Sequence, residues 1–141
     1  MPICPRCTDG ASLTMTPQRR VLVVDDSTLM RQIVQVALRL RGWSTIAAQD
    51  GAEGIALAVK ERPDAILLDV LMPGADGPET LSRLRGDPRS ADIPVIFLTG
   101  LGEADEQHTK LRAMGANGVL VKPFDPGTLA DVVAGALGWS E

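Results

Sequence analysis

The sequence predicts an α/β protein in which a parallel sheet carries helices on both faces, a doubly wound fold. Short apolar runs alternate with amphipathic helical segments five times along the chain. Such alternation builds strand–helix–strand units joined by right-handed crossovers. The length of 141 residues suits one domain. We expect a flexible tail over residues 1–18, which shows no periodicity, and a single folded domain over residues 19–141.

The central strand is predicted over Ala65 to Asp69. It has four apolar residues before Asp69 and is followed by the turn residues Pro73, Gly74 and Gly77, as expected for a strand buried on both faces. An open α/β sheet keeps its ligand crevice at the carboxyl ends of its strands. Asp69 is therefore a candidate functional residue, although an Asp at a strand end can also simply cap the next helix.

Four elements precede this strand. A buried strand over Val21 to Val24 leads into Asp25, Asp26 and Ser27, and either of the last two can cap a helix. That helix has apolar residues at helical spacing and ends at a glycine: Met30, Ile33, Val34, Ala37, Leu38 and Gly42. A more polar strand, typical of a sheet edge, and a second helix follow over Ser44 to Ala48 and Gly51 to Glu61.

Five elements are predicted after the central strand. The first four are a helix over Pro78 to Arg85, a buried strand over Pro94 to Thr99, a helix over Glu103 to Met114 and a strand over Gly118 to Lys122. Asp125 is expected to cap the last helix. Its predicted apolar stripe is Leu129, Val132, Val133, Ala136 and Leu137.

Five strands of this kind suit a flavodoxin-like sheet with strand order 2-1-3-4-5. The first and third strands are then neighbours, and their carboxyl ends carry Asp25, Asp26 and Asp69. The fourth strand ends in Thr99 and the fifth in Lys122. All five polar side chains are expected at one edge of the sheet.

These residue types suit phosphoryl chemistry with a divalent cation. Three converging carboxylates repel one another, and their oxygens are ligands that Mg²⁺ prefers; we expect Mn²⁺ to substitute. With the cation bound, Asp69 can attack a phosphoryl group as a nucleophile. Lys122 supplies positive charge and Thr99 a hydroxyl hydrogen bond to the phosphoryl oxygens. A metal site without covalent chemistry would explain the acids but not Lys122 and Thr99.

Four segments together make the sequence resemble the receiver domain of two-component response regulators. They are VLVVDDSTLMR, ILLDVLMPGADG, PVIFLTG and GANGVLVKPF, spread across Arg20 to Leu137. The resemblance implies that Asp69 accepts a phosphoryl group from a histidine kinase or a phosphotransfer protein. It also implies that Asp26, Asp69 and the backbone carbonyl of Leu71 bind Mg²⁺ directly and that Asp25 binds it through water.

The resemblance also assigns the other residues at this edge. It implies that Thr99 is the switch hydroxyl, that Lys122 is the phosphate partner, and that the bond between Lys122 and Pro123 is cis. The sequence departs from the family at Val119, because the family usually has Tyr or Phe three residues before the lysine. Valine has no ring to swing inward on activation, so output modes that need this aromatic residue are not expected.

The expected function is that of a stand-alone phosphoacceptor switch, because the chain ends at Glu141, four residues after Leu137. It would promote its own phosphotransfer and dephosphorylation and signal by phosphorylation-dependent docking or phosphorelay. A phosphate sink or a receiver-like binding module without its own output is the alternative. Two other classes fit less well. An Asp phosphatase needs a second Asp where Leu71 stands, and a flavin-binding module needs more aromatic residues than 3%.

The composition argues against some classes of binding partner. A net charge of −4 argues against nucleic acid and anionic membranes as partners. No apolar run approaches the roughly 18 residues that a membrane span needs, and we expect a cytoplasmic protein. Cys4 and Cys7 are interpreted as a reduced pair in the tail, with a zinc site shared between two chains as the competing interpretation, because four ligands are needed and the only histidine is His108.

Overall fold

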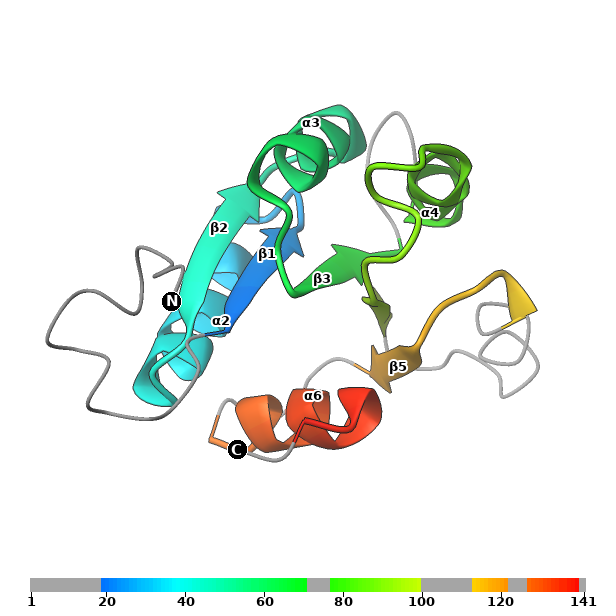
Figure 1. The fold of residues 1–141 in the computed structure, drawn as a ribbon. Helices are drawn as coiled ribbons and strands as arrows, with labels where there is room; N and C mark the ends of the chain where they lie inside the picture. The colour runs from blue at the N-terminus through cyan, green and yellow to red at the C-terminus, as the bar shows by residue number, and fades with distance from the viewer. Residues whose placement is uncertain (1–18, 71–76, 100–112, 122–126, 140–141) are drawn as a thin grey trace, which may run out of the picture.

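The structure, a computed structural model, describes residues 19–70, 77–99, 113–121 and 127–139. Within these ranges five parallel strands form one sheet in the order β2-β1-β3-β4-β5, which confirms the predicted fold class and strand order (Figure 1). The strands are β1 (Arg20–Val24), β2 (Ser44–Ala48), β3 (Ala65–Asp69), β4 (Val95–Thr99) and β5 (Gly118–Val121). The helices are α2 (Thr28–Leu40), α3 (Gly51–Glu61), α4 (Gly77–Gly86) and α6 (Leu129–Leu137).

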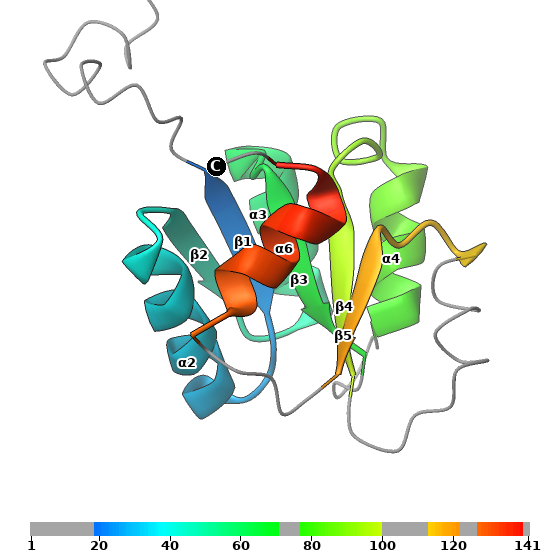
Figure 2. The same cartoon turned by 90° about the horizontal axis from the view of Figure 1, so that it is seen from below.

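One apolar core lies on each face of the sheet. Helices α3 and α4 cover one face, and α2 and α6 cover the other (Figures 1 and 2). Successive side chains of a strand point to opposite faces, so Leu22 and Val24 enter the core under α3 and α4 while Val21 and Val23 enter the other. Strands β3 and β4 are buried along their whole length, which makes the end of β3 a rigid support for Asp69.

The register of the strands brings their carboxyl ends to one edge. Val24 of β1 is paired with Leu68 of β3, so the chain leaves β1 at Asp25 beside Asp69. On the other side of β3, Asp69 is paired with Leu98 of β4, and Thr99 comes next. The predicted gathering of polar residues at one sheet edge therefore follows from pairing alone.

Side-chain caps begin α2 and α3. Ser27 is the N-cap of α2, and its hydroxyl accepts a hydrogen bond from the Met30 amide at 3.2 Å, which confirms one of the two predicted caps. Asp50 caps α3 by accepting from the Glu53 amide at 2.8 Å, while the Glu53 carboxylate accepts from the Gln49 amide at 2.8 Å. Such caps satisfy backbone donors that have no partner within the helix.

The last helix has a different capping residue from the predicted one, and the face that it buries is partly different. Helix α6 begins at Leu129 with Thr128 as its N-cap, so Asp125 is not the capping residue; Asp125 itself lies outside the described residues. The helix buries Leu129, Ala130, Val133 and Ala134, whereas Val132 and Ala136 are exposed. The predicted stripe was right at Leu129, Val133 and Leu137 and wrong at Val132 and Ala136. The helix has one charged residue, Asp131, and therefore almost no polar pattern to fix its orientation.

Parts of other predicted elements lie outside the described residues. The helix expected over Glu103 to Met114 is described only at its last two residues, where Met114 lies in a turn. Lys122, the predicted end of the fifth strand, and the cysteine pair in the tail also lie outside. Among the helices that the structure describes, none combines the length and the apolar character needed to cross a membrane.

An aromatic cluster packs the residues after α6 against the amino ends of β1 and β2. The rings of Trp43 and Trp139 meet edge to face with centroids 5.2 Å apart. The guanidinium of Arg19 lies 4.4 Å from the Trp139 ring centroid, and that of Arg41 lies 5.6 Å from the Trp43 ring centroid. These residues flank the amino ends of β1 and β2, so the cluster lies at the sheet edge opposite Asp69.

Candidate functional site

Three carboxylates meet where β1 and β3 end. One oxygen atom from each of Asp25, Asp26 and Asp69 lies within 4.8 Å of the others. Asp25 is 1% exposed and Asp69 is 7% exposed, whereas Asp26 faces solvent. The structure thus brings together the three acids that the sequence predicted, with two of them fixed by the sheet and one at the rim.

Backbone hydrogen bonds fix the loop that carries two of these acids. The Asp25 amide donates to the carbonyl of Ala48 at 3.1 Å, which extends the pairing of β1 with β2 by one residue. The Asp25 carboxylate accepts from the Ser27 amide at 2.9 Å. Asp25 is therefore tied to the edge strand and to the start of α2.

Arg31 is a residue at the site that the sequence analysis missed. Its guanidinium donates to the backbone carbonyl of Asp25 at 2.7 Å and to the hydroxyl of Thr28 at 3.1 Å. It brings a positive charge to the loop of the acidic cluster. The sequence feature that could have identified Arg31 is its distance from the N-cap. A residue four positions after Ser27 lies one helical turn beyond the cap, and a long side chain there can reach the preceding loop.

Gly77 approaches the strand that holds Asp69 too closely for any side chain. A Cβ atom there would lie 2.5 Å from the Asp69 carbonyl oxygen, 2.8 Å from the Val70 Cα and 2.9 Å from the Phe97 ring. The Gly77 amide also donates to the Val70 carbonyl at 2.9 Å. The sequence analysis interpreted this glycine only as a turn signal, since close packing of two backbones leaves no other trace in one sequence.

Thr99 lies at the same edge, at the buried end of β4. It is 1% exposed, and its hydroxyl oxygen has no hydrogen-bond partner among the described residues. A buried hydroxyl normally has a hydrogen-bond partner, so the position of Thr99 beside the acidic cluster makes its hydroxyl a candidate ligand contact. Thr99 pairs with Val121 of β5, and Lys122 is the next residue along that strand's chain, outside the described residues.

The donor set fits a Mg²⁺ site. Mg²⁺ takes oxygen ligands, often one or two carboxylates with several waters, and the cluster offers two buried carboxylates and one exposed one whose oxygen atoms lie within 4.8 Å of one another. Leu71, whose carbonyl was the fourth predicted ligand, lies outside the described residues. The acidic cluster thus has the donor chemistry of a Mg²⁺ site.

Val119 occupies the place where an aromatic residue was expected from the resemblance. It is half-buried, is paired with Phe97 across β4 and β5, and packs against the core under α3 and α4. A valine in this position fills space next to the sheet and has no ring that can change its exposure.

Comparisons with known proteins agree with this geometry. The family model described as the response regulator receiver domain matches residues 21–134. The DNA-binding dual master transcriptional regulator RpaA of Synechocystis is 42% identical over 106 residues, which are 75% of this chain and 44% of that protein. The phosphate regulon transcriptional regulatory protein PhoB of Pseudomonas aeruginosa is 38% identical over 108 residues, 77% of this chain and 47% of that protein. The chain thus spans about half the length of these curated relatives.

Solved structures match over almost their whole length. The match to the chemotaxis protein CheY4 of Vibrio cholerae has a TM-score of 0.78 and 36% sequence identity. It covers 85% of this chain and 99% of the CheY4 chain. A putative response regulator from Chloroflexus aurantiacus has a TM-score of 0.80 and 32% identity and covers 86% of this chain and 99% of its own.

Proposed function

The chain belongs to the response regulator receiver domain family, and on that premise we propose that Asp69 accepts a phosphoryl group from a histidine kinase or a histidine phosphotransfer protein. The observation that carries the proposal is the meeting of Asp69, at the end of a fully buried strand, with Asp25 and Asp26 within 4.8 Å. Of the three acids, Asp69 alone comes from the central strand β3.

The proposed step is the transfer of one phosphoryl group. A carboxylate oxygen of Asp69 attacks phosphorus, and a phosphorus–oxygen bond forms. The phosphorus–nitrogen bond of the donor phosphohistidine breaks, and its electron pair returns to the imidazole. Bound Mg²⁺ supplies positive charge that offsets the negative charge of the carboxylates and the transferred group. Asp26, Asp69 and the carbonyl of Leu71 would hold the ion, Asp25 would hold it through water, and Mn²⁺ is expected to replace it.

Two further side chains are proposed to recognise the transferred group. The Thr99 hydroxyl, buried and without a partner in the described part of the chain, would donate a hydrogen bond to a phosphoryl oxygen. Lys122, next in the chain after the residue paired with Thr99, would contribute positive charge. A phosphoryl group at Asp69 would therefore give the Thr99 hydroxyl an acceptor that the described part of the chain does not supply.

The phosphorylated protein is proposed to act as a switch in the cytoplasm rather than as a multiple-turnover enzyme. It would signal by docking to a partner protein or by passing its phosphoryl group on, and a phosphate sink is the alternative. Val119 in place of an aromatic residue favours an output that depends on Thr99 and on the surrounding loops. The net charge of −4 argues against contact between this domain and nucleic acid.

Labelling with acetyl phosphate and Mg²⁺ tests the proposal and separates it from the other classes. We expect one stable phosphoryl group per chain in the native protein and none in Asp69→Asn, which keeps the shape of the side chain but not the nucleophile. Asp92→Asn is the matched control, because Asp92 is exposed and precedes β4 at the opposite edge of the sheet. Continuous release of phosphate without a labelled intermediate would instead indicate a phosphatase, and no reaction would indicate a binding module.

A further inference from the structure

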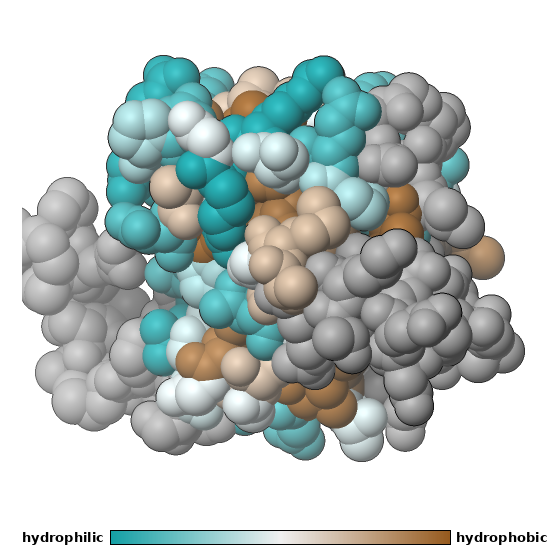
Figure 3. Space-filling view, turned by 90° about the vertical axis from the view of Figure 1, so that its right-hand side faces the viewer, coloured by the Kyte–Doolittle hydropathy of each residue, from teal (hydrophilic) through white to brown (hydrophobic). Residues whose placement is uncertain are grey.

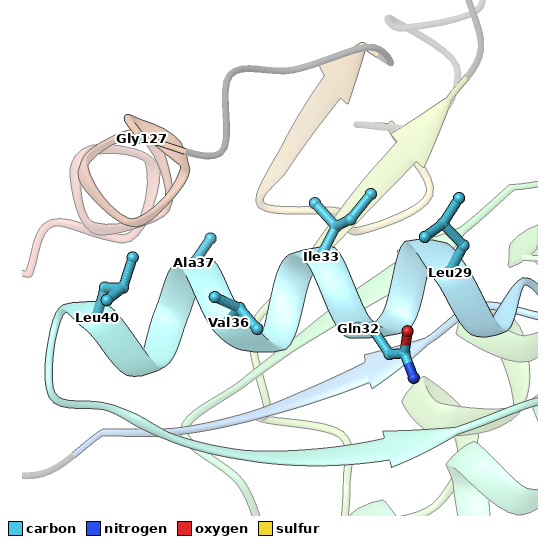
Figure 4. Close-up of a pocket in the computed structure, with 7 residues that line it drawn as sticks. All are labelled: Leu29, Gln32, Ile33, Val36, Ala37, Leu40 and Gly127. Carbon is cyan, nitrogen blue, oxygen red and sulfur yellow. The ribbon is translucent and has the colours of Figure 1, made fainter.

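Arg31 is a charged residue on the side of α2 that packs on the sheet. It is half-buried and stands three residues before Val34 and seven before Leu38, which are both buried. Residues at this spacing share one helix face. Figure 4 shows the residues of α2 that line a groove beside Gly127, and Arg31 is not among them. A charged side chain on a packing face is normally held by specific partners, so the partners of Arg31 indicate its role.

Both hydrogen bonds of Arg31 go to neutral oxygens at the start of α2. Its guanidinium donates to the backbone carbonyl of Asp25 at 2.7 Å and to the hydroxyl of Thr28 at 3.1 Å. Other arginines pair with carboxylates, as Arg83 does with Glu79 at 2.6 Å, and such pairs are ordinary on a hydrophilic surface like the upper part of the face in Figure 3. Arg31 therefore steadies the loop without occupying a carboxylate oxygen.

The carbonyl that Arg31 holds belongs to the peptide group between two neighbouring acids. On one side of this group the Asp25 amide donates to the Ala48 carbonyl at 3.1 Å. On the other side is Asp26, whose carboxylate forms no hydrogen bond or ion pair with another residue in the described ranges. Because a peptide group is planar, fixing its carbonyl fixes the direction in which the chain enters Asp26. The exposed carboxylate is thus placed through its backbone, and Arg31 holds that backbone.

Arg31 has two opposite effects on a cation at the acidic cluster. Its positive charge repels the cation, whereas its hydrogen bond orients Asp26. Asp26 faces solvent, which screens the repulsion. The loss of a contact that orients a metal ligand costs about 10- to 100-fold in metal affinity. The orienting effect is therefore expected to be the larger one, and the two effects change the affinity in opposite directions.

We propose that Arg31 is a positioning residue, which holds the peptide group between Asp25 and Asp26 so that the Asp26 carboxylate is placed for a divalent cation. Arg31 acts through the loop and is not a metal ligand, because a guanidinium has no acceptor atom. This role rests on the metal site of the proposed function and adds to it a residue from α2. It predicts that Mg²⁺ binds more weakly when the positive charge of Arg31 is removed, against the expectation from charge alone.

The test is titration calorimetry of the full chain with MgCl₂ and without a phosphodonor. We expect Arg31→Ala to weaken Mg²⁺ binding at least about tenfold. Arg31→Lys keeps the charge but has no planar fork to span both oxygens, and we expect it to recover only part of the loss. Arg39→Ala is the matched control, because it removes the same charge from the exposed last turn of α2; its affinity should stay within about twofold of the native value.

Unchanged or tighter Mg²⁺ binding in Arg31→Ala overturns the positioning role, and so does a loss of stability to urea with native Mg²⁺ affinity, which marks a purely structural contact. Circular dichroism shows whether each variant is folded. If Arg31→Ala does not fold, Arg31→Lys decides, because charge alone predicts native affinity and positioning predicts weaker binding. A native protein that binds no Mg²⁺ overturns this role together with the metal site. Failure to label Asp69 overturns the proposed phosphotransfer and leaves the binding result standing.

Discussion

At the scale of single residues, Asp26 is the member of the acidic cluster that can be changed at least cost to the fold, because it faces solvent. Asp26→Ala removes one proposed metal ligand, and we expect Mg²⁺ affinity to fall at least about tenfold, or roughly 1.4 kcal/mol. Titration calorimetry is the suitable measurement, because Trp43 and Trp139 lie at the opposite sheet edge and give no signal from the site. Phosphorylation of the native protein should also stop in excess chelator.

Equal Mg²⁺ affinity in Asp26→Ala and the native protein would contradict the ligand assignment. Asp92→Ala serves as the control, since it also removes one exposed carboxylate and therefore changes the net charge by the same amount. A loss of affinity in both variants would show a general electrostatic effect instead of a lost ligand.

Two leucines are expected to set the lifetime of the phosphorylated state. Leu71 and Leu101 stand two residues after Asp69 and Thr99 in the sequence, and in the family these positions flank the path of the hydrolytic water. Neither side chain can orient a water molecule. We expect Leu71→Asn with Leu101→Glu to lose its label about tenfold faster after the donor is removed, or roughly 1.4 kcal/mol off the barrier. Unchanged or slower decay would show that these side chains do not control access of water.

At the scale of the elements, the strand–loop–helix unit from β3 to α4 depends on Gly77. Gly77→Ala pushes a methyl group into the Asp69 carbonyl, which would lie 2.5 Å away, and we expect a loss of about 1–3 kcal/mol in the free energy of unfolding. Gly86→Ala in the same helix is the control, because a Cβ atom there meets nothing within 4 Å; it should be neutral or stabilising by up to about 1 kcal/mol. Urea unfolding measures both. Equal stability of the two variants would show that the close approach of Gly77 is relieved without cost.

The elements differ in how far the sequence predicts them, and the reason is physical. Strands β2 and β3 and helix α3 have the predicted bounds. Each is followed closely by Asp, Gly or Pro, and these turn residues mark where the element ends. The sequence of α6 is nearly all apolar or small, so several faces of the helix could be buried. Packing against the rest of the domain decides which face is buried. At the site, strand order alone gathers Asp25, Asp26 and Asp69. The spacing of Arg31 from Ser27 brings its side chain within reach of the loop, and its rotamer then decides that it contacts the Asp25 carbonyl.

At the scale of the whole molecule, the first described residue, Arg19, contacts the last described one, because its guanidinium lies 4.4 Å from the Trp139 ring centroid. We expect deletion of Met1 to Pro17 to leave the melting temperature and the rate of labelling by acetyl phosphate unchanged, since it spares this contact and all of β1. A fall of several degrees, or zinc bound at one ion per two chains in the native protein, would show that Cys4 and Cys7 have a structural role.

Asp69 is the residue proposed to receive the phosphoryl group, and the position of the modification can be mapped by chemical reduction. The native protein is labelled with acetyl phosphate and Mg²⁺, reduced with borohydride, which converts an aspartyl phosphate to homoserine, and digested for peptide mass spectrometry. We expect homoserine at position 69 alone, and none when Mg²⁺ is withheld. Homoserine at Asp25 or Asp26 instead, or equal conversion at position 69 without a divalent cation, would contradict it.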